Sequence, residues 1–238
     1  MSGFLEYGDN YLDSEGLKIA LKEFKDQKGD SYPESYKKET FEVLNSELKG
    51  KDVSSSNILE IVQLLKEENP DDGSFCYWSE LDALEQFAKR KPEEAAESFR
   101  NLLYAEEDLE ARITSFRDAV EQNSDEDFGV YSAGTAYVLA AFDVGKFVPY
   151  NGEAYNRFVS WFSTDYDVPG SVSDKLVQYY DICEVVKEFA AFESLLSAQD
   201  LIYSSTKYDE LQDKIPLLYI WKFTKKWNKF SNNTELFL

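Results

Sequence analysis

The chain has 238 residues, of which 43% are hydrophobic and 16% aromatic, so it can bury a real core and is not disordered over most of its length. Its 46 acidic residues outnumber its 25 basic residues, and the formal charge of -21 repels nucleic acid and anionic lipid except where a patch is locally basic. The sequence contains no histidine, which excludes mechanisms that use imidazole as a base, a proton shuttle or a zinc ligand.

The N-terminal segment and the cysteines are typical of a protein of the reducing cytoplasm. Residues 1–10 lack the basic start and apolar run of a secretory signal, and no stretch has the roughly 18 apolar residues of a membrane span. We therefore expect a cytoplasmic protein without membrane association. Cys76 and Cys183 are far apart and lack a CxxC spacing, so both are expected to be reduced core residues.

Apolar residues recur at helical spacing along nearly the whole chain, which predicts an all-α fold. The first helix is expected to follow Asp13 and Ser14, either of which can cap it, and to end at Gly29. The second is entered through Pro33 and ends at Gly50. The third follows the serines at 54–56 and stops at the turn 70–73, the clearest turn in the sequence.

Three helices are expected after this turn, and a more buried one follows them. They cover residues 78–91, a stretch that begins at Pro92 with an acidic first turn, and a stretch from Asp108 to the polar loop at 123–127. Residues 132–142 are apolar and rich in alanine, which permits close approach of neighbouring helices. We expect this segment to be the most buried helix.

The last third of the chain is predicted to continue as helices separated by short loops. One helix runs through 155–162, a single long one covers 174–196, and 201–203 is a short apolar segment. The total is an irregular array of about ten helices. The expected organisation is an N-terminal helical subdomain at 1–70, a main helical domain at 71–230 and a tail at 231–238, with one continuous domain as the alternative.

The predicted final helix, residues 214–230, is the local exception to the acidity, because it contains five lysines and no acid. Aromatic residues line much of the opposite side of this helix. The pattern predicts contact with DNA phosphates or with an acidic partner. The alternative is a terminal helix that packs on the body and neutralises its acidic surface. The candidate contact residues are Lys222, Lys225, Lys226 and Lys229.

Lys146 and Tyr150 are two further candidate contact residues. Tyr150 follows Pro149 and lies near Lys146 in the sequence, so it is the aromatic side chain most expected to be exposed and to stack against a base. Elsewhere, aromatic residues at core spacing are expected to form the core itself.

No catalytic, cofactor or metal site is predicted. The sequence lacks a phosphate-binding glycine loop, a nuclease triplet after the Pro70-Asp71 turn and a serine nucleophile motif. The acidic runs at 106–108 and 125–127 lack the ligand spacing of a calcium loop. A metal-dependent enzyme that uses these runs is the third hypothesis for function.

Two stretches of the sequence carry a family resemblance. The first is 78–116, which contains FRNLLY and DLEARI. The second is 136–162, where LAAFDVGKFVPY precedes YNRF. Together they resemble the helical region ahead of the motor in McrB-like AAA+ ATPases, with its Asp-Pro-x-x-Tyr/Phe-x-x-Tyr signature. Val144 stands where that signature has proline. A similar segment, AQDLIY, lies at 198–203, and the resemblance covers roughly residues 75 to 205.

This resemblance implies a non-catalytic accessory module of a modification-dependent restriction or antiviral defence system. Such a module would act in DNA targeting or in docking an AAA+ ATPase or nuclease subunit. The alternative is a stand-alone acidic protein that mimics DNA and occupies a DNA-binding site on another protein. A high-salt host would also produce this acidity without any functional cause.

Overall fold

The computed structural model describes residues 4–8, 10–28, 35–70, 75–126, 128, 132–163 and 170–206. Within them the chain forms ten helices and one short antiparallel hairpin, which confirms the all-α prediction. No helix in these ranges is long and apolar enough to cross a membrane. The elements are β1 (Phe4–Tyr7), β2 (Asn10–Asp13), α1 (Ser14–Lys28), α2 (Ser35–Leu48), α3 (Ile58–Glu67), α4 (Trp78–Arg90), α5 (Pro92–Tyr104), α6 (Leu109–Asn123), α7 (Ala133–Phe142), α8 (Gly152–Phe162), α9 (Val172–Ala190) and α10 (Leu195–Ser205).

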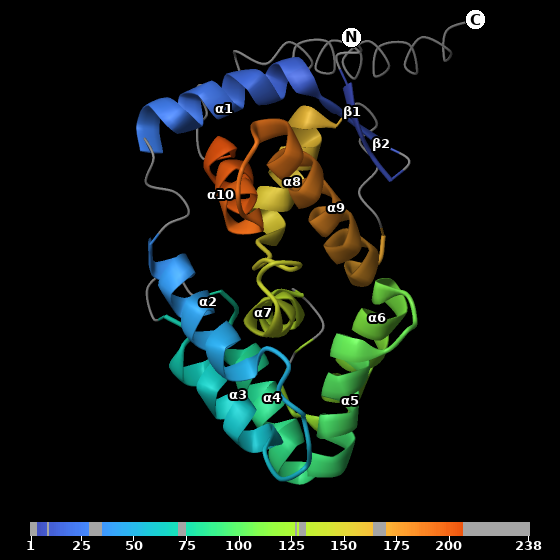
Figure 1. Cartoon of the computed structure of the whole chain (residues 1–238). Helices are drawn as coiled ribbons and strands as arrows, with labels where there is room; N and C mark the ends of the chain where they lie inside the picture. Colours follow the sequence, from blue (N-terminus) through green and yellow to red (C-terminus); the bar gives the residue numbers. More distant parts are fainter. Residues whose placement is uncertain are drawn as a thin grey trace, which may run out of the picture.

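The helices form two groups with α7 between them (Figure 1). The hairpin and α1 pack with α8, α9 and α10 at one end of the molecule, while α2 to α6 form the other end. The beginning of the chain therefore lies beside the last described helix. The predicted boundary at residue 70 falls between α3 and α4, which pack against each other, and the division into subdomains stays a prediction.

Helix α7 is the most buried helix, as the sequence predicted, because all ten of its residues are buried. A side chain of α2 provides hydrogen-bond partners for the backbone groups at the C-terminal end of α7. The Asn45 side-chain amide donates to the carbonyls of Ala140 and Ala141, each at 3.0 Å, and the Asn45 amide oxygen accepts from the Val144 N–H at 3.1 Å. These bonds replace the water that the last carbonyls of an exposed helix would find.

The hairpin was not predicted. Its strands have four residues each, pair Leu5 with Leu12 and are joined through Gly8, whose φ of +53° favours glycine. Leu12 is buried and bridges to Ser163 after α8, and the Tyr7 hydroxyl donates to the Ser163 hydroxyl at 2.9 Å. These contacts to the end of α8 hold so short a hairpin in place.

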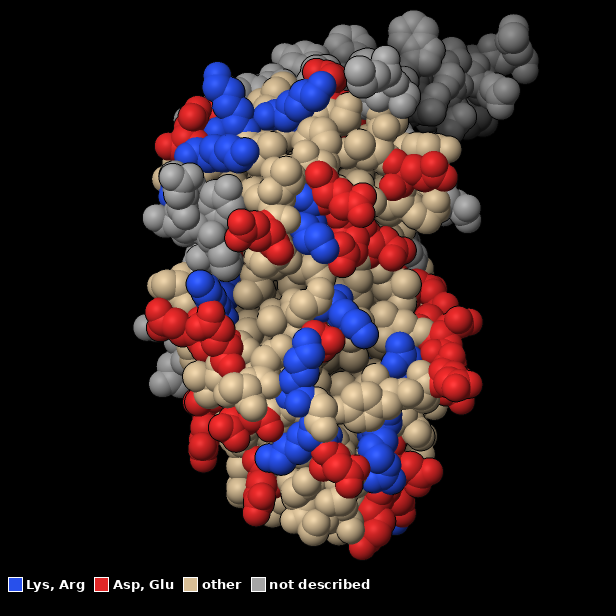
Figure 2. Space-filling view, viewed as in Figure 1, with Lys and Arg blue, Asp and Glu red and all other residues tan. Residues whose placement is uncertain are grey.

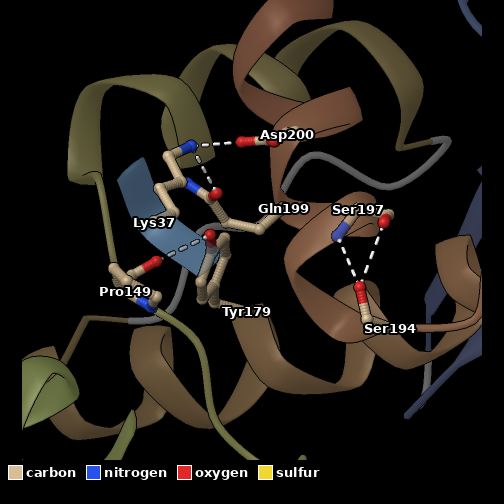
Figure 3. Close-up of polar contacts among 7 residues, drawn as sticks. All are labelled: Lys37, Pro149, Tyr179, Ser194, Ser197, Gln199 and Asp200. Carbon is tan, nitrogen blue, oxygen red and sulfur yellow. Dashed lines mark hydrogen bonds and ion pairs between the residues drawn. The ribbon is translucent and has the colours of Figure 1, made fainter. Parts of the chain in front are cut away.

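The predicted long helix at 174–196 is wrong at its C-terminal end, and the predicted short segment at 201–203 lies inside α10. Ala191 takes a left-handed conformation with φ 53°, and the N–H of Phe192 donates to the Lys187 carbonyl at 3.0 Å, which closes α9. The Phe192 ring then packs on Phe24 of α1. Ser194 caps α10 by accepting from the Ser197 N–H, as Figure 3 shows.

A buried ion pair joins α2 to α10 (Figure 3). Lys37 is 4% exposed and Asp200 2% exposed, and the Lys37 ammonium contacts the Asp200 carboxylate. The ammonium also donates to the Gln199 side-chain oxygen at 2.8 Å and lies 5.5 Å from the centre of the Tyr203 ring. The charge is thus compensated on several sides, which a buried lysine requires.

Removing one member of this pair is expected to destabilise the protein more than removing both. Lys37→Met leaves the Asp200 carboxylate buried without its cation and should lower the free energy of unfolding by about 3–5 kcal/mol. The double variant K37M/D200N should lose less than the sum of the single losses, because neither charge remains. Urea denaturation of the unmodified protein, K37M, D200N and the double variant measures the coupling between the two residues.

Lys38→Met is the matched control. Lys38 is the next residue of the same helix after Lys37, and it forms an exposed ion pair with Glu42. Its loss should be below about 1 kcal/mol. Equal losses for K37M and K38M would contradict a stabilising role of the buried pair.

Candidate binding cleft

A cleft with a volume of about 630 Å³ lies where four helices begin. Residues 75–77 precede α4, Ala133 begins α7, residues 151–153 lead into α8 and Val172 begins α9. The side chains of Asn156, Arg157 and Lys175 complete the lining. The first N–H groups of a helix carry partial positive charge, and the carboxylate of Glu80 compensates them at α4 and α7, so α8 and α9 bring the positive helix ends to this cleft.

Tyr150 is buried in the wall of this cleft and is not an exposed platform, which corrects the sequence prediction. It is 7% exposed, and its ring packs against Tyr155 and Tyr179 at 5.8 and 5.1 Å between centroids. The Tyr179 hydroxyl donates to the Pro149 carbonyl at 3.0 Å and thereby fixes the segment that carries Tyr150 (Figure 3). The sequence neighbours of Tyr150 suggested exposure, but the rings that cover it come mainly from α8 and α9.

The Tyr150 hydroxyl has no hydrogen-bond partner among the described residues. It lies 3.5 Å from the position that a Cβ on Gly152 would occupy, at the start of α8. Burial raises the pKa of Tyr150 far above its ordinary value, so the phenol keeps its proton at neutral pH. It is therefore a hydrogen-bond donor that faces the cleft.

Two cations line the cleft, and they differ in their partners. Arg157 pairs with Glu153 at 2.7 Å and donates to the Thr206 carbonyl at 3.3 Å. Lys175, half-buried in the first turn of α9, forms no ion pair with any residue that the structure describes. Since Arg157 and Glu153 compensate each other, Lys175 is the uncompensated charge of the described lining.

Cys76 also lines the cleft, and its thiol is expected to have low reactivity. Burial, together with the nearby Glu80 carboxylate, raises the pKa of Cys76 well above its ordinary value. The group is therefore a thiol and not a thiolate at neutral pH, which makes it a weak nucleophile. Cys183 is buried as well, so both cysteines are core residues, as predicted.

Glu80 holds the starts of α4 and α7, a structural role that the sequence did not predict. It is 1% exposed, and its two carboxylate oxygens accept from the Tyr77 N–H at 3.1 Å and from the Gly134 N–H at 2.9 Å. One side chain thus caps α4 and α7 together and fixes two of the four helix starts. A glutamate three residues after a potential cap residue was the available signal, but the bond to Gly134 has no local signature.

The remaining predicted contact residues are not brought together in the cleft. Lys146 is exposed in the turn after α7 and does not line the cleft. The lysines at 222, 225, 226 and 229 lie outside the described residues. Within the described ranges, no group of three or more Cys, Asp or Glu residues has an arrangement that could hold a metal ion.

No protein-family model, curated protein or solved structure matches this chain.

Removal of the Glu80 carboxylate should destabilise the protein, because two buried N–H groups lose their acceptor. We expect Glu80→Ala to lower the free energy of unfolding by about 2–4 kcal/mol. Glu97→Ala on the exposed face of α5 is the control and should stay within about 0.5 kcal/mol of the unmodified protein. Similar losses in both variants would rule out the double cap.

The stability contributed by Glu80 should also depend on pH. Burial raises its pKa above the ordinary 4.5 and outweighs the opposing hydrogen bonds from Gly134 and Tyr77 and the charge of Arg117. A raised folded-state pKa means that the contribution is fully present below 4.5 and is lost as the pH rises through the folded-state value. As the pH is lowered from 7 to 4.5, the melting temperature of the unmodified protein should therefore rise relative to that of E80Q. A difference that is constant with pH would contradict this assignment.

Proposed function

We propose that this protein is a non-catalytic helical interaction module, which works through what it binds. The observation that carries this proposal is that Cys76 and Tyr150 are buried in the wall of the cleft, at 4% and 7% exposure. Cys76 and Tyr150 both have raised pKa values and keep their protons at neutral pH. A buried thiol and phenol are weak nucleophiles and poor bases, whereas a phenol donates a hydrogen bond well. These groups suit recognition of an acceptor better than covalent or acid–base catalysis.

We further propose that the module belongs to a McrB-like modification-dependent restriction or antiviral defence system in the cytoplasm, where it binds DNA or docks an AAA+ ATPase or nuclease subunit. The resemblance at 78–116 and 136–162 supports this part of the proposal. These two segments form α4 to α6 and α7 to α8, and α7 contacts all three helices of the first segment. The resembling residues therefore form a contiguous part of the fold.

The lysines at 222, 225, 226 and 229 are the proposed DNA contacts, because they lie in the longest acid-free basic stretch of the chain. The DNA-mimic alternative requires a surface of carboxylates with few cations between them. On the face drawn in Figure 2, lysines and arginines interleave with the acids, although acids gather along the edge over α6. That face favours the interaction module.

DNA binding should depend on salt and on these four lysines. Fluorescence anisotropy with a labelled duplex of about 20 base pairs, recorded from about 20 to 200 mM salt, measures the affinity and its salt slope. Replacing all four lysines by glutamine should weaken binding and reduce the slope by roughly 3 to 4, the value for four lost phosphate contacts.

A matched control replaces four exposed body lysines by glutamine, at positions 18, 38, 89 and 91. It has the same net charge as the test variant and should retain the slope. Identical losses in the two variants would assign the effect to net charge, and no duplex binding at the lowest salt would contradict the DNA-binding role.

A further inference from the structure

The hydroxyl of Tyr150, on an otherwise buried side chain that opens into the cleft, points to a ligand there. The side chain is 7% exposed, its hydroxyl meets no acceptor among the described residues, and it lines the cleft beside Gly152. A donor that the described residues leave unpaired at the wall of a cavity is a position where a ligand atom can gain a hydrogen bond. The ligand must therefore bring an acceptor.

The charges that line the cleft favour a negatively charged acceptor. Lys175 brings a positive charge to the cleft, and Arg157 and Glu153 already compensate each other at 2.7 Å. An anion would be the counter-charge that Lys175 lacks among the described residues. The rest of the body is acidic and repels anions at long range, so a bound anion would be held by this local site and not by the overall field.

The start of α8 adds further donors in the same place. Asn151 caps the helix by accepting from the Ala154 N–H at 2.9 Å, while the N–H groups of Gly152 and Glu153 precede the first intrahelical bond. Gly152 has no side chain to cover the backbone. Lys175 lies in the first turn of α9, so the positive ends of two helices add to its charge.

We propose that the cleft binds the phosphate group of a small molecule, held by the Lys175 ammonium, the Tyr150 hydroxyl and the first N–H groups of α8. Donors on three different elements match the several oxygens of a phosphate better than the two oxygens of a carboxylate. The volume of about 630 Å³ exceeds that of a phosphate and lies in the usual range for small-molecule pockets. Tyr77, 55% exposed at the lining, offers a ring for a planar group of the ligand. This inference goes beyond the proposed function, because the site does not use the lysines at 222–229.

The test is calorimetric titration of the full chain, in phosphate-free buffer at low salt, with inorganic phosphate and separately with adenosine 5′-monophosphate. We expect both probes to bind. Equal affinities for the two probes would show that the phosphate group alone determines binding. Tighter binding of the nucleotide would show that its planar base also contributes. Tyr150→Phe and Lys175→Gln should each weaken binding by about tenfold or more, since each removes one donor to a charged acceptor.

Lys187→Gln is the matched control, because Lys187 lies on the same helix but pairs with Glu184 and does not line the cleft. It should bind as the unmodified protein does. Tyr150→Phe keeps the ring and loses only an unpaired hydroxyl, so its melting temperature should be unchanged or higher, which separates loss of binding from loss of folding.

Failure of both probes to bind at millimolar concentration, or binding that survives Y150F and K175Q together, would overturn the proposal. Duplex binding by Y150F should equal that of the unmodified protein. The phosphate site and the DNA-binding role can therefore fail independently of each other.

Discussion

A helix that is buried along its whole length cannot rely on water at its ends, and α7 imposes this constraint on its neighbours. All ten of its residues are buried, so its first N–H groups and last carbonyls must find partners in other helices. Glu80 of α4 supplies an acceptor at the N-terminal end, and Asn45 of α2 supplies donors at the C-terminal end. The positions of α2 and α4 are thereby tied to α7 through polar groups, in addition to apolar packing.

The cleft is a consequence of this arrangement. Because Glu80 caps α4 and α7 at once, these two helices begin at the same place, and α8 and α9 also begin there. Helix starts that converge leave donors without intrahelical partners, and the chain satisfies some of them with Asn151 and Ser171. Gly152 and Glu153, whose N–H groups precede the first intrahelical bond of α8, line the cleft together with Tyr150 and Lys175. The capping of the buried helix α7 thus also determines where the hydrogen-bond donors of the cleft lie.

The sequence predicted those parts of the fold that have local causes. Capping residues and turn residues placed the first eight helices close to their observed bounds, and alanine content identified α7 as the most buried. The break between α9 and α10 was missed, since Ala191 takes a left-handed conformation that usually signals glycine and the apolar spacing continues across it. The hairpin was missed because four-residue strands are too short for an alternating pattern.

The candidate site was less predictable than the fold, because its residues act through distant partners. The same holds outside the cleft, where Lys37 looks like a surface lysine in the sequence but its partner Asp200 lies 163 positions away. Glu80 meets Gly134 over 54 positions. Tyr150 was expected to be exposed from its neighbours, whereas rings from α8 and α9 cover it. Local patterns contain no information on such pairings.

The placement of α1 beside α10 has a consequence for the order of events during synthesis. Helix α1 is made before the other described helices, yet its helical packing partner α10 is not complete until residue 205 has been made, whereas α2 to α7 already have one another. The apolar face of α1, with Leu17, Ala20 and Phe24, therefore stays uncovered while most of the chain is translated. Contacts of such long sequence separation form late, so the packing of α1 on α10 is expected to follow the assembly of α2 to α7.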